Sequence, residues 1–548
     1  MKHIPNFFKY ISVILVLMIL VSSCQKQLEK SPLDKFDQST FWTNQSNLML
    51  ALTGLYHGNI VFNKPDYNSS DWWSYSGLLF MEFASDNAYD RRGENSPYQK
   101  LSNGTLTSSI AVLGYYWKNS YSRIANCNYF LENVDKSSAN DDIKNRFKAE
   151  ARFIRACQYF YLSQFYHSVP LVTTTLSPDE ANTVTKASED DVEKFAETEF
   201  IAIAQSLPDY KDMPTSEFGR ASKQAALAFL GRLYLAEQRW ADAAATYKQI
   251  IDLGANIIDP NYAGLFDGSN ESSKEIIFSL QYLQNLDGSS LMQHCDPAVV
   301  GGWHIFCPLG SLVEAYDFND GTPFSYTDPR YDANDIGKDR DPRLKYTVLY
   351  NEENFRGLKY ICHPDSTTSP DQLGAGKQTT QTGYGLKKYI DENYSSNLQS
   401  SGGDLPIIRY AEVLLSYLEA KIEAGEAIDQ GLLDQTINQV RGRASVGLPP
   451  ITETNPTLLL PIVRHERRVE LACEGTRYWD LLRWKTAETV LNDNFYGAPF
   501  PGAKKIKKLN NQNDPYSRWF VTTRKFRADK DYQWPIPQSE VNINPNLQ

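Results

Sequence analysis

The residues best suited to chemistry gather in one stretch, RHERRVELACEGTRYWDLLRW at positions 464–484. It contains five arginines, three glutamates and one aspartate, interleaved with bulky aromatic side chains. Two carboxylates at a defined separation in a cleft would permit acid and base catalysis of glycoside hydrolysis. The same charges could instead form ion pairs that hold a helical scaffold together. The sequence around this stretch indicates which of the two interpretations applies.

Helical spacing favours the structural interpretation of this stretch. Glu466, Glu470 and Glu474 recur every four residues, so they share one face if the helix continues, and two arginines each lie three residues from one of them. Gly475 is expected to end or bend the first helix. Planar guanidinium groups suit partly buried carboxylates. We predict structural ion pairs, and no catalytic residue, for the following set: Arg467, Arg468, Glu470, Glu474 and Arg477.

The elements that must position these residues are helical repeats. Residues 225–251 read AALAFLGRLYLAEQRWADAAATYKQII and carry the small and large residues of a tetratricopeptide repeat at the expected spacing. The small residues let two helices approach closely, and the large ones fill the groove between neighbours. One repeat cannot bury its own apolar face, so further helices must flank it. We predict them at 120–134, 143–165, 191–206, 411–425 and 432–444.

A different kind of sequence separates the two halves of the helical pattern. Residues 254–405 are rich in Gly, Pro, Asp, Asn and Tyr, with short apolar strands such as 276–278. Long loops in a compact protein are usually functional or disordered, and the aromatic side chains here favour ordered loops. The prediction is a single, mainly α body over residues 24–548. It has tetratricopeptide-like repeats at about 120–253 and 407–485 and a loop-rich insertion with short strands at about 254–405.

The first 23 residues are predicted to be a lipoprotein signal peptide. Lys2 and Lys9 precede an apolar run at 11–21, which is too short to span a bilayer as a mature helix. Small residues then lead to Cys24, where a lipid would be attached. An ordinary secretory signal with an incidental cysteine is the alternative. Acyl chains would hold the protein on a membrane without a transmembrane helix.

Charge and metal-ligand patterns exclude several functions. The formal net charge of −11 argues against binding nucleic acid or anionic lipid head groups. No cofactor is expected. The stretch YDANDIGKDRDPR at 331–343 could hold a structural calcium ion through carboxylate and carbonyl oxygens, although it lacks EF-hand spacing.

Six cysteines follow Cys24, and none forms a CxxC or CxxH pair, so a structural zinc site is not expected. Cys127, Cys157 and Cys473 sit among apolar residues and are predicted to be small buried hydrophobic residues. Cys295 and Cys307 are close enough in sequence to pair, but no disulfide is predicted.

A series of motifs runs in order along the whole chain. It comprises LEKSPLDKFDQSTFWTN, EFASDNAYD, GYYWKNSYSRIANCNYFLENV, KAEARFIRACQYFYLSQFYHSVPLV, SLVEAYDFNDG, DRDPRLKYTV, the stretch at 464–484 and YQWPIPQSEVNINPNLQ. With these motifs the chain resembles the SusD/RagB family, nutrient-binding outer-membrane lipoproteins of the Bacteroidetes. The resemblance implies a non-enzymatic protein, facing the cell exterior, that captures oligosaccharides and passes them to a SusC-like TonB-dependent transporter.

The resemblance also implies where ligand would bind. The family uses a loop-covered face on which aromatic rings stack on sugars and polar groups fix their orientation. Two stretches of this chain, 71–98 and 301–306, match the positions that contribute. The candidate ligand-binding residues are Trp72, Trp73, Asp86, Tyr89, Arg91, Arg92, Trp303 and His304.

Each candidate also has a plainer explanation. Trp72 and Trp73 point in different directions, so one of them could be exposed; core packing is the alternative for both. The polar loop that begins at Tyr89 is expected to be exposed, and it could equally be a solvated run of charge. Trp303 follows two glycines, which fits a mobile or closely approached loop and favours ligand contact. His304 is expected to form hydrogen bonds rather than to bind a metal.

Other functions remain open at this stage. A peptide-binding member of the same uptake family would have the same motifs. A glycoside hydrolase would need a recognisable pair of carboxylates, which the sequence does not display. A purely structural repeat scaffold would not need the aromatic insertion.

Overall fold

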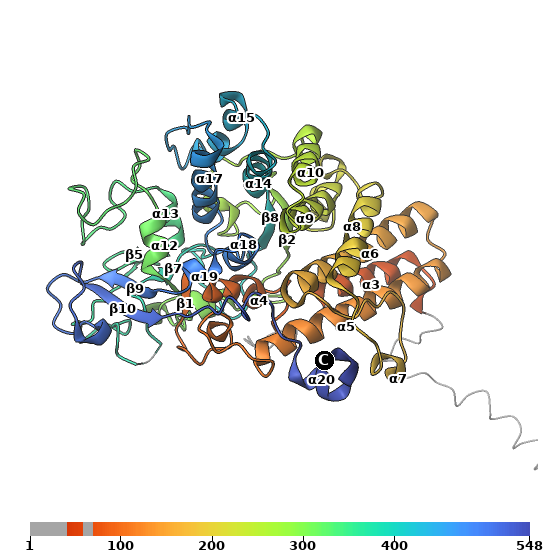
Figure 1. Ribbon diagram of the computed structural model, residues 1–548, viewed down its shortest axis with the longest axis horizontal. Coiled ribbons are helices and arrows are strands. Elements are labelled where there is room, and N and C mark those ends of the chain that lie inside the picture. Colours follow the sequence, from red (N-terminus) through yellow and green to blue (C-terminus); the bar gives the residue numbers. More distant parts are fainter. Residues whose placement is uncertain (1–40, 59–69, 377) are drawn as a thin grey trace, which may run out of the picture.

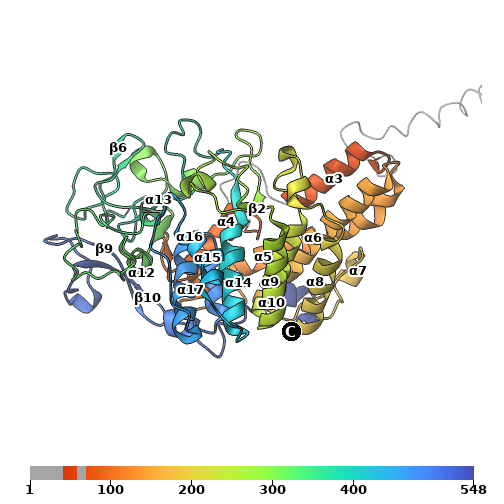
Figure 2. The same cartoon turned by 90° about the horizontal axis from the view of Figure 1, so that it is seen from above.

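The body of the protein is a stack of long helices in which each packs against the next. The computed structural model describes residues 41–58, 70–376 and 378–548. Helix α3 (Gln45–His57) lies against the first two helices of the stack. Figures 1 and 2 show the stack from two directions. Its members, in packing order, are α5 (Ala111–Asn133), α6 (Asp141–Tyr166), α8 (Glu189–Ala204), α9 (Lys223–Ala236), α10 (Trp240–Leu253), α14 (Tyr410–Glu423) and α17 (Pro456–Glu470).

The predicted tetratricopeptide pair forms the middle of this stack. Gly231 on α9 faces the ring of Tyr247 on α10, and a Cβ atom at Gly231 would lie 2.5 Å from Tyr247 Cζ. Only glycine allows this approach. Ala243 is also fully buried between the helices. The mainly α, repeat-based fold predicted from the sequence is confirmed.

Side-chain caps determine where several of these helices begin. Asn140, Ser188 and Ser222 precede α6, α8 and α9, and each side chain accepts the backbone N–H three residues later. Such caps satisfy one of the backbone donors that the first turn leaves unpaired. Helix α10 ends at Leu253, and its C-cap residue Gly254 takes the left-handed conformation that glycine adopts without strain.

Two helical predictions differ from the structure. The helix predicted at 432–444 is broken at Thr436, whose φ of −127° and ψ of −101° are not helical. Helix α17 ends at Glu470 rather than near Gly475. Glu474 therefore lies on the turn after the helix and does not share a helix face with Glu470, which corrects the spacing argument.

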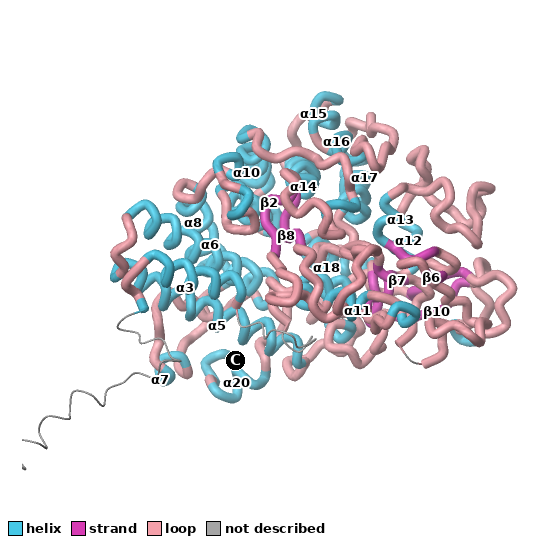
Figure 3. Tube along the Cα trace, turned by 180° about the vertical axis from the view of Figure 1, so that it is seen from behind, coloured by secondary structure: helices cyan, strands magenta, loops and turns pink. Residues whose placement is uncertain are grey.

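The chain between α10 and α14 is rich in loops, and Figure 3 shows these loops gathered beside the helical stack. Among its described residues the longest helix is α12 (Gly310–Ala315). The other short helices of the chain are α4 (Tyr75–Leu79), α7 (Pro178–Ala181), α11 (Leu291–Cys295), α13 (Arg343–Thr347), α15 (Gln430–Gln435), α16 (Ile437–Arg441), α18 (Arg477–Arg483), α19 (Ala487–Val490) and α20 (Gln538–Ile543).

All named strands form two-stranded antiparallel sheets. The pairs are β1–β3, β2–β8, β4–β7, β5–β6 and β9–β10. In β2–β8, Ile276 lies opposite Arg409, and β8 leads directly into α14. The loop-rich region therefore leaves and rejoins the helical stack at neighbouring points. The strands are β1 (Ala88–Asp90), β2 (Ile276–Leu280), β3 (Phe306–Pro308), β4 (Val348–Leu349), β5 (Asn354–Phe355), β6 (Leu358–Lys359), β7 (Gly385–Leu386), β8 (Leu405–Arg409), β9 (Asn494–Pro499) and β10 (Arg518–Thr523).

The cysteines of the described part behave as core residues. All six are free thiols and buried, as predicted for Cys127, Cys157 and Cys473. The proposed lipid-attachment residue, Cys24, and the signal peptide lie outside the described residues. Within the described ranges, no helix combines the length and the apolar character needed to cross a membrane.

Candidate functional site

The two stretches predicted to contact ligand, 71–98 and 301–306, meet in one small sheet. Strand β1 from the first pairs with β3, which begins at the end of the second. The backbone N–H of Arg91 continues the pairing by donating to the carbonyl oxygen of Ile305 at 3.0 Å. Candidate residues that are far apart in the sequence are thus held side by side.

Trp303 lies on a tightly built loop just before β3. Gly301 has a φ of +90°, which side chains rarely allow, and a Cβ atom at Gly302 would lie 2.1 Å from the carbonyl oxygen of Asp296. The glycine pair was expected to mark either a mobile loop or a close backbone approach; the structure shows a close approach. The Trp303 N–H donates to Gln293 O at 2.7 Å, while the ring is half-buried. The loop therefore holds a partly exposed aromatic ring on a fixed backbone.

His294 packs against this ring, and Tyr75 and Tyr282 follow it in a chain of contacts. The His294 ring lies 5.1 Å from that of Trp303, and Tyr75 Oη lies 2.8 Å from His294 Nδ1. The hydroxyl of Tyr282 accepts the N–H of Tyr75 at 3.1 Å. Burial, followed by the charges of Arg92 and Arg91, lowers the pKa of His294 to about 3, so this imidazole is neutral at physiological pH. His294 and Tyr75 are buried and cannot contact a sugar directly, whereas the partly exposed Trp303 and Tyr282 offer an aromatic ring and a hydroxyl of the kind that a sugar requires.

The sequence did not single out Tyr75, Tyr282 or His294. A usable signal was present, because Tyr75 lies within the quoted 71–98 stretch and His294 precedes the glycine pair by only a few residues. Tyr282 had no such signal. It reaches the site through β2, whose partner strand lies more than a hundred residues further along the chain.

The tryptophan pair is part of the core. Trp72 stacks on Tyr116, with ring centroids 4.0 Å apart, and its Nε1 donates to Ser120 Oγ at 3.0 Å. Trp73 packs beneath the guanidinium of Arg123, 5.1 Å from its ring centroid. Both rings are buried. The expectation that one of them could be exposed is wrong, because aromatic side chains of α5 and α6 cover Trp72, and Tyr56, Phe153 and Phe278 surround Trp73.

The polar loop after β1 is less exposed than expected. Tyr89 is buried, and its hydroxyl donates to Glu94 at 3.0 Å. Arg92 is half-buried, and its Nε donates to both carboxylate oxygens of Asp90, at 2.8 and 3.0 Å. Arg91 is half-buried as well. This loop is ordered by its own ion pairs and hydrogen bonds, and not solvated as a free run of charge.

Asp86 joins the first candidate stretch to the helical scaffold. Its carboxylate lies 3.0 Å from Arg468 Nη2, and it accepts Arg477 Nε at 2.8 Å. Burial raises the pKa of Asp86, but the Arg468 and Arg477 guanidiniums outweigh it and hold the pKa well below its ordinary value. Asp86 is buried. It therefore joins the loops to the helical scaffold through ion pairs and does not contact ligand at the surface.

Glu470 is the centre of a buried charge network in the scaffold. Its carboxylate accepts hydrogen bonds from Arg343, Arg409 and Arg443 at 2.9, 3.0 and 2.9 Å. All four side chains are essentially inaccessible. Burial raises the pKa of Glu470, but the three guanidiniums outweigh it and lower the pKa. A carboxylate held ionised among permanent cations cannot donate a proton as a general acid.

The other charges of the 464–484 stretch also pair with distant segments. Arg467 donates to Asp480 at 2.8 Å, and Glu474 accepts from Lys388 at 2.7 Å and from Arg409 Nε at 2.8 Å. Among the described residues, no ion pair joins Arg467 to Glu470 or Arg477 to Glu474. The partners inferred from helical spacing were wrong: Arg467 pairs with Asp480 instead, and α17 ends before Glu474 and Arg477 could share one helix face.

His304 is fully buried behind the Trp303 loop. Its Nε2 lies 3.3 Å from Tyr384 O, which fits the hydrogen-bonding role predicted for it. Within the described ranges, no group of three or more His, Cys, Asp or Glu side chains is arranged to hold a metal ion. In the stretch 331–343, considered for calcium, Asp341 is already paired with Arg343 at 2.7 Å.

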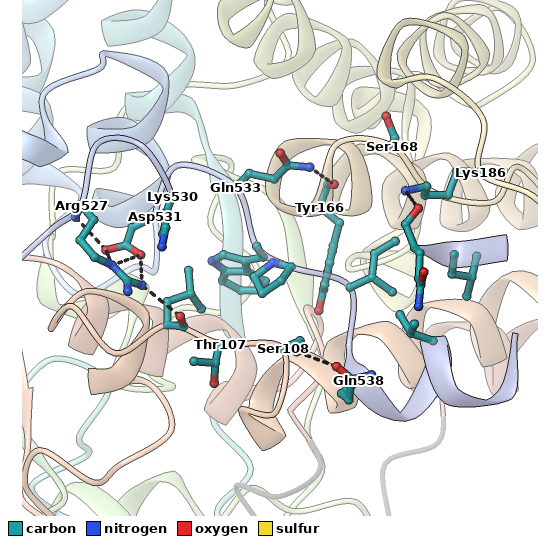
Figure 4. Close-up of a pocket in the computed structure, with 17 residues that line it drawn as sticks. Thr107, Ser108, Tyr166, Ser168, Lys186, Arg527, Lys530, Asp531, Gln533 and Gln538 are labelled. Atoms are coloured by element: carbon teal, nitrogen blue, oxygen red, sulfur yellow. Dashed lines mark hydrogen bonds and ion pairs between the residues drawn. The ribbon is translucent and has the colours of Figure 1, made fainter. Parts of the chain in front are cut away.

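A cavity of about 660 Å³ lies beside the C-terminal segment (Figure 4). Its polar walls are tied together, since Gln533 donates to Tyr166 O at 3.1 Å and Ser108 donates to Gln538 at 3.2 Å. Its two aromatic residues, Tyr166 and Trp534, are fully buried. The cavity offers hydrogen-bonding groups but no open ring face, so the Trp303 loop is the better candidate for binding a sugar.

Comparisons with known proteins agree along the whole chain. The sequence model of the SusD family matches residues 274–548, and a second model, described as "Starch-binding associating with outer membrane", matches residues 28–235. A solved SusD-like carbohydrate-binding protein from Bacteroides fragilis is 50% identical, with a TM-score of 0.90, over 93% of this chain and 100% of that chain. SusD-like protein P25 of Formosa agariphila is 25% identical, over 98% and 97% of the two chains. The starch-binding protein SusD of Bacteroides thetaiotaomicron is 23% identical, over 100% and 98%.

Proposed function

Since the chain belongs to the SusD family, we propose that it is a non-catalytic, glycan-binding lipoprotein of the outer membrane. It captures oligosaccharides on the face that carries Trp303 and passes them to a SusC-like TonB-dependent transporter. The membrane association in this proposal is supported by the description of the second family model. The transporter as partner follows from the family resemblance.

One observation carries the glycan assignment. The half-buried Trp303 ring is held on a fixed loop, with its ring 5.1 Å from that of the neutral His294. Sugars present C–H faces that pack on aromatic rings and hydroxyls that need hydrogen-bonding partners. A relative that is half identical to this chain is described as carbohydrate-binding, which supports the same class of ligand.

The state of the nearby carboxylates supports a binding protein rather than a hydrolase. A hydrolase needs two accessible carboxyl groups facing one glycosidic bond. Asp86 and Asp90 are buried and paired with arginines. Burial raises the pKa of Asp296 to about 7, despite Arg356 beside it, which is a value suited to an acid catalyst. Asp296 has no accessible surface, however, so it cannot reach a substrate.

Calorimetric titration tests the binding function. The mature chain without its lipid would be titrated with malto-, laminari-, xylo- and galacturonan oligosaccharides, and each mixture would be analysed for products. We expect saturable binding of at least one of these oligosaccharides and no new reducing ends. Released reducing ends would identify a hydrolase. Binding of peptides with no binding of any oligosaccharide would replace the glycan by a peptide as the ligand.

Membrane attachment has a separate test. Because an apolar run of the N-terminal segment leads to Cys24, replacing Cys24 with Ala should move the protein from the membrane fraction to the soluble fraction. Mass spectrometry of the mature N-terminus should find acyl chains only on the native protein. Retention of the Cys24→Ala protein in the membrane fraction, with no lipid on the native N-terminus, would refute the anchor.

A further inference from the structure

A buried carboxylate supports the Trp303 loop from below. Asp371 is fully buried and accepts two successive backbone N–H groups, from Ala298 at 2.6 Å and from Val299 at 2.9 Å. These two residues open the short turn Ala298–Val300, which leads into the glycine pair. Hydrogen bonds from N–H groups to a carboxylate are about twice as strong as those between neutral groups. Asp371 thus fixes the start of the loop from a segment more than seventy residues further along the chain.

The residue after Trp303 faces the same carboxylate. His304 is fully buried and has a φ of +49°, a conformation that costs free energy for any residue other than glycine. Its Nε2 lies 3.3 Å from Tyr384 O, and its Nδ1 lies 3.6 Å from Asp371 Oδ1. A backbone conformation of this cost persists only where the surroundings enforce it. Asp371 therefore holds the loop by hydrogen bonds before the tryptophan and lies beside it after the tryptophan, where 3.6 Å is too long for a hydrogen bond.

The inner side of the loop is fixed by backbone hydrogen bonds. The N–H groups of Trp303, His304 and Ile305 donate to carbonyl oxygens at the end of α11 and just after it, at 2.7, 3.0 and 2.6 Å. These bonds hold the loop against α11. The outer turn also has bonds within itself and one from Gln293 Nε2 to Gly301 O at 2.8 Å, but the N–H groups of residues 298 and 299 are satisfied by the Asp371 carboxylate.

We propose that Asp371 is a positioning residue for glycan binding. It holds the loop in the conformation that presents the Trp303 ring. The entropy lost in ordering this loop is therefore lost on folding and not on binding. This proposal rests on the proposed function, because it gives Trp303 the role of sugar platform. Asp371 itself, having no accessible surface, does not touch the glycan.

Asp371→Asn is the direct test. Asparagine keeps the shape of the side chain, but it has one acceptor oxygen instead of two and no charge. The protein would be labelled with fluorotryptophan, and the Trp303 signal in the ¹⁹F NMR spectrum would be assigned by its absence in Trp303→Phe. In Asp371→Asn we expect that signal to shift or broaden while the other tryptophan signals stay in place. We also expect affinity for the panel oligosaccharide that binds the native protein to fall at least tenfold.

A second variant acts from the other side of the contact. Ala298→Pro removes the N–H that donates to Asp371 and leaves the carboxylate in place. The preceding Pro297 has a φ of −70° and a ψ of 161°, which a following proline accepts. This variant should disturb the Trp303 signal and the affinity in the same direction. It keeps the test decisive if Asp371→Asn does not fold.

The chain offers a control with the same donor pattern at Asp365, which is half-buried rather than fully buried. This carboxylate also accepts two successive backbone N–H groups, from Lys504 at 2.7 Å and from Lys505 at 2.9 Å, but it fixes a different loop. Asp365→Asn should leave both the Trp303 signal and the glycan affinity unchanged.

The outcomes separate the positioning role from the function itself. An Asp371→Asn protein with an unchanged Trp303 signal and an affinity within twofold of native would overturn the positioning role, even if Trp303→Ala abolished binding. An unchanged affinity in Trp303→Ala would also overturn the positioning role, because the sugar would then not stack on Trp303. If the native protein bound no oligosaccharide of the panel, the proposed function would fail. The ¹⁹F comparison, which needs no glycan, would still decide whether Asp371 holds the loop.

Discussion

Glu470 in the helical scaffold and Asp371 in the loop-rich region are both fully buried carboxylates, and they are satisfied in opposite ways. Glu470 is surrounded by three arginine side chains from three different segments. Asp371 is held by two backbone N–H groups of one short turn. Charged side chains join distant parts of the fold, whereas backbone donors fix the conformation of a single loop. The richest cluster of charge in the sequence therefore builds the scaffold, and a loop with little charge presents the candidate ligand surface.

Glu470→Gln tests the scaffold side and should have the largest effect. It leaves three buried guanidiniums short of a counter-charge, and breaking a buried ion pair from one side costs about 3–5 kcal/mol. Urea denaturation should show a loss of unfolding free energy of that size. Glu423→Gln is the control, because the pair between Glu423 and Arg464 is partly exposed and should be worth about 0–1 kcal/mol. Equal losses in the two variants would contradict the assignment of Glu470 as the centre of a buried network.

Asp86→Asn tests the ion pairs by which Asp86 joins the loop after β1 to the helical scaffold. It should cost about 1.5–3 kcal/mol at pH 7, the usual range for hydrogen bonds to a charged group. The pKa of Asp86 is below its ordinary value in the folded protein, so the carboxylate's contribution is present above about pH 4 and is lost as the pH falls through the folded pKa. The difference in unfolding free energy between variant and native protein should therefore shrink between pH 7 and pH 3. A difference that stayed constant with pH would show that the charge of Asp86 does not contribute.

Trp303→Ala tests the loop side and should separate binding from folding. Loss of one large side chain that stacks on a sugar should weaken glycan binding by about 1–3 kcal/mol. The unfolding free energy should change by less, because the ring is only half-buried. Titration calorimetry and urea denaturation of the same protein measure both quantities. If the Trp303→Ala variant lost as much unfolding free energy as Glu470→Gln, Trp303 would be a structural core residue and not a ligand contact.

Gly301→Ala should have the smallest effect on stability. A Cβ atom there meets no neighbour within 4 Å, so the cost is the left-handed backbone alone, about 1 kcal/mol. Gly502→Ala is matched, since its φ is +78° and its Cβ position is also open. Both should lose similar unfolding free energy in urea, while only Gly301→Ala should weaken glycan binding. An equal change in affinity in both variants would show that the shape of the Trp303 loop is not what matters.

The sequence predicted the parts of the fold that follow from local spacing. The small residue at Gly231 and the ring of Tyr247 predicted one helix pair, and the change of composition at residue 254 predicted where loops replace helices. It could not predict the partners of Glu470, because Arg343, Arg409 and Arg443 come from three segments outside its helix.

The same limit explains the errors in the candidate site. Asp86 occupies a polar stretch that reads as a surface loop, but Arg468 and Arg477 reach it from the other end of the chain and bury it. Trp303 could be named because two glycines precede it. Asp371 could not, because its contacts with residues 298 and 299 are made through the backbone and leave no pattern in side-chain type.

A crystal structure of the mature protein soaked with the oligosaccharide that binds most tightly tests the central claim most directly. The account predicts a sugar ring packed on Trp303, with hydroxyls bonded to neighbouring polar groups, and with the 464–484 charges in the same ion pairs as in the free protein. Sugar bound only in the cavity beside Trp534, with none at Trp303, would contradict the account.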